Sequence, residues 1–579
     1  MSITKKPYSL ASICRTAAAL CMAAASLVTA HAAPIDLADQ PLFSTVGVPG
    51  NLLLAVSAEW PTVSTPAYLS TTAYDAATTY VGYFDAAKCY RYVDYTVPAD
   101  GHFTPHGLAA ANHACTSTTT ASLWSGNYLN WASTQTMDAF RWALTGGDRV
   151  VDTTTSTIIE KTRHSGQGNR SSIYPDKVLT SGSSGATPFN WSVVNSRVWG
   201  LGTALYFSGG QELSCSFATN GSRRTTFTCN ASSVGGGTAA PQTAGNTPAE
   251  GGSATVTAAL NGSAGTLTCT VTRSASNVNS GNDYTYSCST SLSGGTACAA
   301  AASHSSGSAA ATCNTAATVT DYAGQSTAAG NAPATAVYKV NARVKVCDTT
   351  VGLEANCKQY GSNYKPEGLI QQYAQKLRYS TFGYLNDSGD TPFRRDGGVM
   401  RARMKYVGPT TPIPGSPSVS NTRTEWDAAT GVMLQNPDAS DATATTAEST
   451  TAGYTVTITN SGVMNYLNRF GKIETGNYKG YDPVSEMYYA GQRYFRNLGN
   501  VSEYSSLASA GSLATMKTWL DGFPVINTWD DPILYTCQKN FILGIGDVYT
   551  HRDKNLPGST IRGTDEPAVP AAVSGDSTV

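Results

Sequence analysis

Cysteines at short spacings constrain this chain more than any other feature of its sequence. Ten of the 13 cysteines form neighbouring pairs: Cys89 with Cys115, Cys215 with Cys229, Cys269 with Cys288, Cys298 with Cys313, and Cys347 with Cys357. Such spacings predict local disulfides in an oxidising compartment, although spacing alone leaves the connectivity open. Cys14 and Cys21 lie in an expected leader. Cys537 is left over, and we expect its partner elsewhere, beyond Val579 if the natural chain is longer.

The first 32 residues have the pattern of a secretory signal peptide. Basic residues up to Arg15 precede an alanine-rich apolar stretch, and Ala30-His31-Ala32 fits a small-residue cleavage site. The apolar core is too short to span a membrane, and no later stretch is apolar enough for a transmembrane anchor. We therefore expect residues 1–32 to be removed and the remainder to be exported to the periplasm, the outer membrane or a surface structure.

Charge is scarce along the chain. Only 13% of residues are charged and the net charge is -1, which gives no support to a nucleic-acid or anionic-membrane partner. The sequence contains 55 Gly and 31 Tyr, together with long Ser/Thr/Ala tracts. Its surface is therefore expected to be kept polar by hydroxyls and amides.

Residues 209–336 are expected to form a Ser/Thr/Gly/Cys-rich β insertion. Segments around Cys215 and Cys229, and again around Cys269 and Cys288, alternate apolar and hydroxyl residues at period two, with each Cys on the apolar face. Each unit is predicted to be a hairpin with a disulfide between its strands, and Cys298 with Cys313 a poorer third copy. Because large apolar residues are few, disulfides would have to provide rigidity.

The flanking segments, 33–208 and 337–560, have the strand and helix patterns of one α/β domain. Asn51–Val56 and Phe541–Ile545 are predicted buried strands, and Asp482-Pro483 a helix start. Residues 408–460 are polar and are expected to be loop. Arg401, Arg403 and Lys405 alternate along one strand face and are expected to form a solvated sheet edge. Residues 561–579 are expected to be a disordered tail.

Six stretches, taken in order, resemble the PilC/PilY family. They are Gly82–Asp85 with Lys88–Tyr90, Ser125–Ala132, Asn363–Leu369, Arg395–Val399, Tyr481–Glu486 and Cys537–Asp547. Proteins of this family have an amino-terminal region that is often similar to a von Willebrand A domain and a carboxy-terminal β-propeller that can bind calcium. The resemblance implies a degenerate von Willebrand A-like α/β domain, interrupted by the disulfide-rich insertion. No propeller pattern follows Asp547, so no calcium cofactor is expected for this sequence, although a full-length propeller would offer one.

The metal site of von Willebrand A domains tests the resemblance residue by residue. Its first loop requires Asp-x-Ser-x-Ser, whereas the matching loop here reads Ser57-Ala58-Glu59-Trp60-Pro61. Asp482 stands where the second loop supplies Thr, and Asp547 matches the Asp of the third loop. A divalent cation needs convergent oxygen ligands, and Glu59 is longer and starts from another position than the usual Asp. We therefore expect a remnant of this site that holds no metal.

The resemblance implies a type IV pilus biogenesis factor and pilus-tip adhesin that acts by protein–protein contact. Its expected partners are minor pilins and the pilus machinery, and a host or abiotic surface. A secreted hydrolase on a degenerate binding scaffold is the alternative, and it requires a deep pocket with carboxyls of shifted pKa near the strand ends. The sequence contains no Gly-x-Ser-x-Gly, His-Glu-x-x-His or Walker A motif, so we expect no enzyme.

Overall fold

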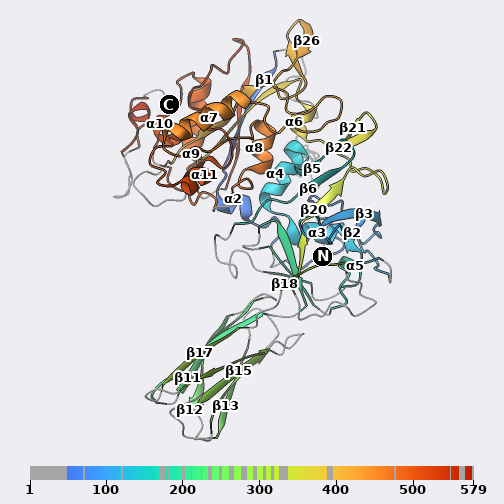
Figure 1. Cartoon of the computed structure of the whole chain (residues 1–579), viewed down its shortest axis with the longest axis vertical. Coiled ribbons are helices and arrows are strands. Elements are labelled where there is room, and N and C mark those ends of the chain that lie inside the picture. Colours follow the sequence, from blue (N-terminus) through green and yellow to red (C-terminus); the bar gives the residue numbers. More distant parts are fainter. Residues whose placement is uncertain are drawn as a thin grey trace, which may run out of the picture.

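The computed structural model in Figure 1 describes most of the chain beyond the predicted signal peptide. The described residues are 48–69, 72–118, 121–165, 167, 176–179, 183–191, 193, 194–198, 202–209, 212–222, 224–232, 238–246, 251–259, 266–274, 283–290, 297–303, 308–314, 319–324, 337–387, 395–474, 477–547, 550–553, 555–559 and 568–576. They form a mixed α/β structure in which strands outnumber helices. Among them, no helix is both long and apolar enough to cross a membrane.

A four-stranded sheet with β1 (Gly50–Val56) inside it organises the first part of the structure. Strands β23 (Leu377–Gly383) and β27 (Asn540–Ile545) lie parallel to β1 on its two sides, and β24 (Val399–Lys405) is antiparallel to β23. Leu53 and Leu54 are fully buried and belong to two different apolar clusters, because successive side chains point to opposite faces of the sheet. We call this sheet and its helices the parallel-sheet domain.

Helices cover both faces of the parallel sheet (Figure 1). On one side α8 (Val463–Arg469) packs on β23 and β24, and on the other α9 (Val484–Phe495) packs on β1 and β27. The domain also contains α2 (Trp60–Ser64), α6 (Leu369–Gln372), α7 (Ala439–Thr451), α10 (Ser502–Ser505), α11 (Leu513–Leu520), α12 (Ala571–Ser574) and the hairpin of β25 (Thr410–Ile413) with β26 (Ser416–Ser420).

Strand β27 was predicted to be buried, and this prediction is wrong for its outer side. It is the edge of the sheet, paired only with β1 among the described strands, and Leu543 is 43% exposed. The apolar run predicted burial because strands of parallel sheets are usually covered on both faces. Here no described element pairs with the outer edge of β27.

A second unit, the small domain, is built around an aromatic core. Its six-stranded sheet has the order β4-β2-β3-β20-β6-β5 and its five-stranded sheet the order β18-β19-β9-β8-β7. Trp124, Phe207, Tyr322 and Tyr338 are buried between them. The elements are β2 (Lys88–Val93), β3 (His102–Leu108), β4 (Trp124–Ser125), α3 (Gly126–Ser133), α4 (Thr136–Thr145), β5 (Asp148–Asp152), β6 (Thr157–Glu160), β7 (Lys177–Leu179), α5 (Ser183–Ala186), β8 (Val194–Arg197), β9 (Ala204–Ser208), β18 (Val319–Asp321), β19 (Val337–Asn341), β20 (Arg343–Val346), β21 (Cys357–Tyr360) and β22 (Asn363–Pro366).

The order of these units along the chain differs from the predicted order, in which one α/β domain was interrupted only by the β insertion. Residues 33–208 were expected to form the first part of the α/β domain, yet only the segment of β1 and α2 contributes to the parallel sheet. The small domain therefore lies between β1 and β23 in sequence. Arg141 of α4 joins the two units, because its guanidinium donates to the carbonyls of Leu467 and Phe470.

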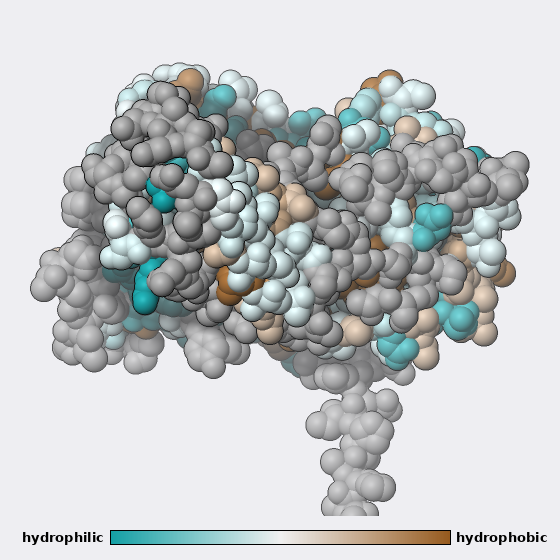
Figure 2. Space-filling model, turned by 90° about the horizontal axis from the view of Figure 1, so that it is seen from below, coloured by the Kyte–Doolittle hydropathy of each residue, from teal (hydrophilic) through white to brown (hydrophobic). Residues whose placement is uncertain are grey.

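Residues 212–314 form a β-sandwich that extends away from both domains (Figure 1). One sheet has the order β12-β11-β10-β17 and the other β13-β14-β15-β16. The strands are β10 (Glu212–Thr219), β11 (Arg224–Ser232), β12 (Thr238–Asn246), β13 (Ser253–Ala259), β14 (Thr266–Arg273), β15 (Tyr284–Thr290), β16 (Ala297–Ala302) and β17 (Ala309–Asn314). Seen from the sandwich end, the described surface is mostly of intermediate hydropathy with scattered hydrophilic side chains (Figure 2).

Five disulfides in the described residues join the pairs that the spacing predicted: Cys89–Cys115, Cys215–Cys229, Cys269–Cys288, Cys298–Cys313 and Cys347–Cys357. Two of them link directly paired strands, β10 with β11 and β14 with β15, as expected for the two hairpins. The third unit is not a hairpin, because β16 pairs with β15 and β17 pairs with β10. The Cys298–Cys313 disulfide therefore connects the two sheets of the sandwich.

The predicted insertion, 209–336, also includes residues that belong to the small domain. Strand β18 pairs with β19, and Tyr322, which is 1% exposed, packs its ring against Trp124 and Phe189. The sandwich itself therefore ends before Val319.

Three further expectations on the carboxy-terminal half differ from the structure. Within 408–460, expected to be loop, residues 439–451 form α7. Its N-cap Asp438 and its first-turn residue Asp441 pair with basic side chains of β24. Lys405, expected on a solvated edge, is 5% exposed and pairs with Asp438 at 2.7 Å, and Arg401 is 1% exposed. In the expected disordered tail, residues 568–576 contain α12, and Val573 is fully buried. The other residues of the tail either flank α12 or lie outside the described residues.

Candidate functional site

Three carboxylates meet at the carboxyl ends of the parallel strands. Glu59 follows β1, Asp547 follows β27, and Asp482 stands just before α9. One carboxylate oxygen from each lies within 4.8 Å of the others. This edge is where open α/β sheets place their ligands, because loops from neighbouring strands converge there. The structure thus brings together the three acids that the sequence placed at the three loops.

Glu59 has a structural role in addition to its place in this carboxylate cluster. It is the N-cap of α2, and its Oε1 accepts a hydrogen bond from the backbone N–H of Thr62 at 2.8 Å. Its side chain is 1% exposed. Burial raises the pKa of Glu59 to about 8, since removing the carboxylate from water disfavours its charged form.

Asp482 is held by a histidine at the surface. Its Oδ1 lies 2.7 Å from Nδ1 of His551, whereas its Oδ2 is buried without a hydrogen-bond partner. Burial raises the pKa of Asp482 to about 6, against the lowering effect of His551. The His551 side chain is 57% exposed. The motif Asp547-x-x-x-His551 therefore contributes to the carboxylate cluster at both of its ends.

The first loop does not supply the hydroxyl that a von Willebrand A metal site requires. The Ser57 hydroxyl is fully buried and lies 3.4 Å from the hydroxyl of Tyr384. The nearby Lys479 directs its ammonium toward Asp396, at 3.5 Å, rather than toward Glu59. The negative charges of the three acids can be neutralised either by bound protons or by one hard cation. In this loop, however, Ser57 stands at the Asp position, Glu59 and Pro61 stand at the two Ser positions, and Glu59 is already a helix cap.

A fourth acid, Glu486, lies one turn into α9 and had no site role in the sequence analysis. Its Oε1 accepts from the backbone N–H of Asn555 at 2.7 Å, and the neighbouring Asp553 accepts from the N–H of Ser485 at 2.9 Å. Burial raises the pKa of Glu486 to about 9. One signal in the sequence pointed to Glu486. It stands in the first turn after Asp482-Pro483, where an acidic side chain stabilises the N-terminus of a helix.

The structure does not collect the histidines that follow β2 into a site. His102 contacts the carbonyl of Asp100, and His113 that of Ala76. Neither they nor His106 belong to a metal-capable group in the described part of the chain. Of the tyrosines near α9, Tyr489 and Tyr494 are each 2% exposed and belong to the core, while Tyr488 is 49% exposed.

Comparison with known proteins supplies the remaining information. The family profile described as PilY1 homolog, small alpha/beta domain, matches residues 71–204, and the profile of the PilY1 homolog second domain matches 387–578. A protein named type IV pilus biogenesis factor PilY1 homolog from Xylella fastidiosa is 38% identical over 94% of this chain, which spans 36% of that protein. A second protein of the same name and organism is 40% identical over 14% of the chain and 5% of its own length. No solved structure matches.

Proposed function

This chain belongs to the PilY1 homolog family, and on that premise we propose that it serves in type IV pilus biogenesis and as a pilus-tip adhesin. It acts by protein–protein contact with minor pilins and the pilus machinery, and with a host or abiotic surface, and not by catalysis. Its place is the periplasm, the outer membrane or the pilus tip. The disulfides and the pilus-factor relatives fit an exported protein.

The observation that carries the contact proposal is the exposed apolar edge at β27. Leu534 and Leu543 are 53% and 43% exposed, and Tyr535 is 37% exposed. Exposed leucine and tyrosine side chains that lie close together in the sequence offer apolar anchors to a protein partner. We assign this apolar surface to a contact with a pilus subunit.

Leu543→Lys tests this assignment in cells that produce the full natural protein. A lysine at this position replaces an apolar anchor with a hydrated charge, so surface piliation should fall several-fold. Leu498→Lys is the matched control, because Leu498 is 42% exposed and belongs to the segment after α9 and not to β27. Equal piliation in the two variants would remove the edge from the proposal.

The sandwich is assigned the adhesive contact. It extends away from the two domains, and both family profiles leave it out (Figure 1). Replacing residues 211–317 with a short Gly/Ser linker should lower attachment while leaving piliation intact. Deleting 209–336 is the informative comparison, since it also removes Tyr322 from the aromatic core and should lower protein levels. Equal loss of attachment and piliation in the 211–317 variant would contradict this division of roles.

The parallel-sheet domain is proposed to be a degenerate von Willebrand A-like scaffold. Support comes from β1 with parallel neighbours on both sides, the antiparallel edge strand β24, and acids in the three expected loops. We propose that Glu59, Asp482 and Asp547, with Ser57, are a remnant that holds no divalent ion. Adding millimolar Mg²⁺, Mn²⁺ or Ca²⁺ should then leave the unfolding temperature unchanged, and a shift abolished by Asp547→Asn would contradict the remnant.

The hydrolase alternative gains little from the same acids. It requires carboxyls of shifted pKa, and Glu59 and Asp482 have them. Their hydrogen bonds to Thr62 and His551, however, are those of a helix cap and a loop anchor. No comparison with known proteins supports this alternative.

A further inference from the structure

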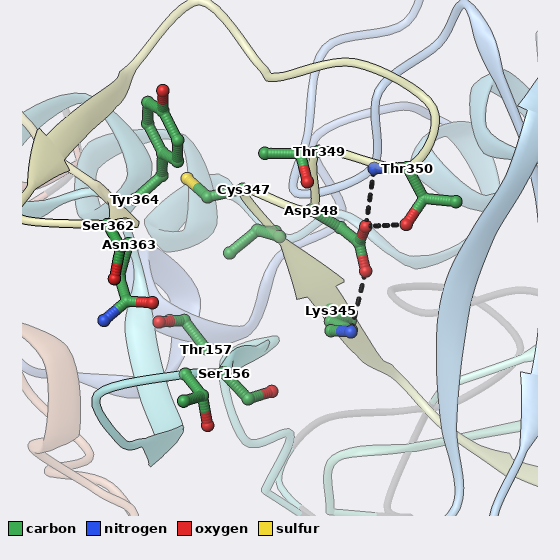
Figure 3. A pocket seen from close by; sticks show the side chains of 12 residues that line it. Ser156, Thr157, Lys345, Cys347, Asp348, Thr349, Thr350, Ser362, Asn363 and Tyr364 are labelled. Atoms are coloured by element: carbon green, nitrogen blue, oxygen red, sulfur yellow. Dashed lines mark hydrogen bonds and ion pairs between the residues drawn. The ribbon is translucent and has the colours of Figure 1, made fainter.

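A polar cavity lies on the small domain at the end of β20 (Figure 3), and none of its lining residues belongs to the carboxylate cluster. Three segments form it: residues 155–157 at the start of β6, residues 345–350 at the end of β20, and residues 362–364 at the β21–β22 turn. Its volume is about 240 Å³. A space of this size suits one sugar-sized ring better than an extended ligand.

Hydroxyls and one amide dominate the lining of this cavity. Ser156, Thr349 and Ser362 present hydroxyls that can both donate and accept hydrogen bonds, and Asn363 adds an amide with both capacities (Figure 3). Tyr364 lies at one side of the cavity. The hydroxyls of a pyranose, each able to donate and to accept a hydrogen bond, match such a polar lining.

Charge in the cavity is balanced within it. The Lys345 ammonium lies 2.7 Å from Asp348, whose carboxylate also accepts from the backbone N–H of Thr350 at 2.8 Å. The bonds from Lys345 and Thr350 outweigh the effect of burial and lower the pKa of Asp348 to about 2, so this carboxylate stays ionised. A phosphate would have to displace Asp348 from Lys345, and a metal ion would have to displace Lys345 from Asp348. The lining therefore favours a neutral ligand.

The walls are fixed before any ligand arrives. The Cys347–Cys357 disulfide closes the loop after β20, and the backbone N–H of Cys347 donates to Glu354 at 2.7 Å. Glu354 in turn is paired with Lys88 at 2.6 Å. A pre-organised wall lowers the entropy lost on binding, which matters for a small ligand with few contacts.

We propose that this cavity binds one neutral sugar ring presented at the end of a glycan. The hydroxyls and Asn363 pair with the ring hydroxyls. The inference is independent of the pilus role, because it concerns a different site and is tested on the purified chain without pili.

Saturation-transfer NMR with the methyl glycosides of glucose, galactose and mannose tests the inference. At least one should bind saturably with a dissociation constant in the millimolar range, about what a single small ring achieves. Glucose 6-phosphate and N-acetylneuraminic acid should bind at least several-fold more weakly than their best neutral counterpart. Absence of saturable binding by all three glycosides, or tighter binding of a charged sugar, would overturn the inference.

Two variants locate the binding. Ser362→Trp places a bulky ring at the exposed mouth and should abolish the signal, whereas Ser420→Trp, on the exposed strand β26, should leave it unchanged. Asn363→Ala should weaken binding about tenfold by removing one amide. Circular dichroism confirms that each variant is folded. Binding that survives both Ser362→Trp and Asn363→Ala places the sugar elsewhere and overturns the assignment.

Discussion

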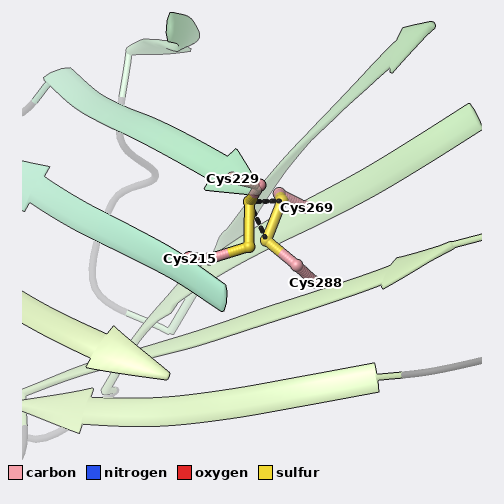
Figure 4. Close-up of side chains that lie close together, drawn as sticks. All are labelled: Cys215, Cys229, Cys269 and Cys288. Carbon is pink, nitrogen blue, oxygen red and sulfur yellow. Dashed lines mark hydrogen bonds between the residues drawn. A yellow bond between two sulfur atoms is a disulfide. The ribbon is translucent and has the colours of Figure 1, made fainter. Parts of the chain in front are cut away.

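The interiors of the sandwich and of the parallel-sheet domain are stabilised in different ways. The parallel sheet is covered by large apolar side chains, such as Leu53, Leu54 and Met464. In the sandwich, six cysteines share the core with a few aromatic rings, including Phe217 stacked on Tyr286 at 4.7 Å. Sγ of Cys229 lies 3.8 Å from Sγ of Cys269 and 3.7 Å from Sγ of Cys288, so two disulfides meet across the sheets (Figure 4).

This difference shows how a chain poor in charge and apolar bulk can still hold a rigid projecting unit. A small apolar core alone gives little stability, and covalent links limit the unfolded chain instead. The exposed face of the sandwich is covered by hydroxyl pairs, such as Thr255 with Thr270 at 2.9 Å. Such a surface leaves few charges to repel another surface at close contact, in keeping with the proposed adhesive role.

Reduction should separate the two regions most strongly. The sandwich disulfides close sequence separations of 14, 19 and 15, each worth about 3 kcal/mol in the chain-entropy model. The parallel-sheet domain has no disulfide among its described residues. Dithiothreitol should therefore remove the sandwich unfolding transition in calorimetry and leave that of the parallel-sheet domain. The variant with 211–317 replaced should lack the sensitive transition, and simultaneous loss of both transitions would contradict independent interiors.

The sequence could predict the sandwich interior because its signals are local. Cysteines on the apolar face of a period-two pattern lie opposite each other once the hairpin closes. It could also place Glu59, Asp482 and Asp547 at one edge, since each follows or precedes a recognisable element. The fold around β24 could not be predicted from local signals. Helix α7 buries Ala442, Thr445 and Ser449, which carry no apolar periodicity, so the helix and the burial of Lys405 were both missed.

The outer edge of β27 was missed for a different reason. A run such as Phe541-Ile542-Leu543 predicts a strand and its burial, but not which neighbour provides the cover. Glu486 was missed because its significance depends on Asn555, 69 residues away in sequence. The orphan oxygen of Asp482 likewise exists only in the folded structure.

Alkaline pH should weaken the parallel-sheet domain and spare the sandwich. The pKa of Glu59 is about 8 in the folded state against 4.5 as its ordinary value, so the folded state binds the extra proton between these values. The stabilisation of the folded state by this proton is complete below about pH 4.5, and it is lost as the pH rises through 8. Between pH 5 and 8 the loss is on the order of 4 kcal/mol if the whole shift is realised.

Glu59→Gln tests that cause directly, because the amide keeps the shape and cannot ionise. Denaturant unfolding of the variant should show a flatter pH dependence for the parallel-sheet domain. The sandwich transition should be nearly flat in both proteins, since Glu212, Arg223, Arg224, Glu250, Arg273 and Asp283 are the only acidic or basic residues, histidine aside, between 212 and 314. An unchanged slope in Glu59→Gln would assign the pH dependence to other acids.

Leucine truncation compares the two interiors at the level of one side chain. Leu54 and Leu267 are both fully buried. Leu54→Ala should cost about 3 kcal/mol, within the range for buried leucines, because the helices on that face cannot collapse into the cavity. Leu267→Ala should cost less, since disulfides hold the sandwich together whether or not that volume is filled. Urea unfolding of each region measures both costs, and an equal or larger cost at Leu267 would show that the sandwich depends on apolar packing after all.

Removal of single hydroxyls should give the smallest effects, and again they should differ between the regions. Thr145 is fully buried in α4, and its Oγ1 donates to Asn468 across the junction of the small and parallel-sheet domains. Thr145→Val leaves the Asn468 acceptor without this donor and should cost about 1–3 kcal/mol. Thr270→Val removes a hydroxyl whose bond to Thr255 is exposed, so water replaces it and the cost should stay below about 1 kcal/mol. A larger effect at Thr270 would mean that the hydroxyl pairs, and not the disulfides beneath them, hold the sheets of the sandwich.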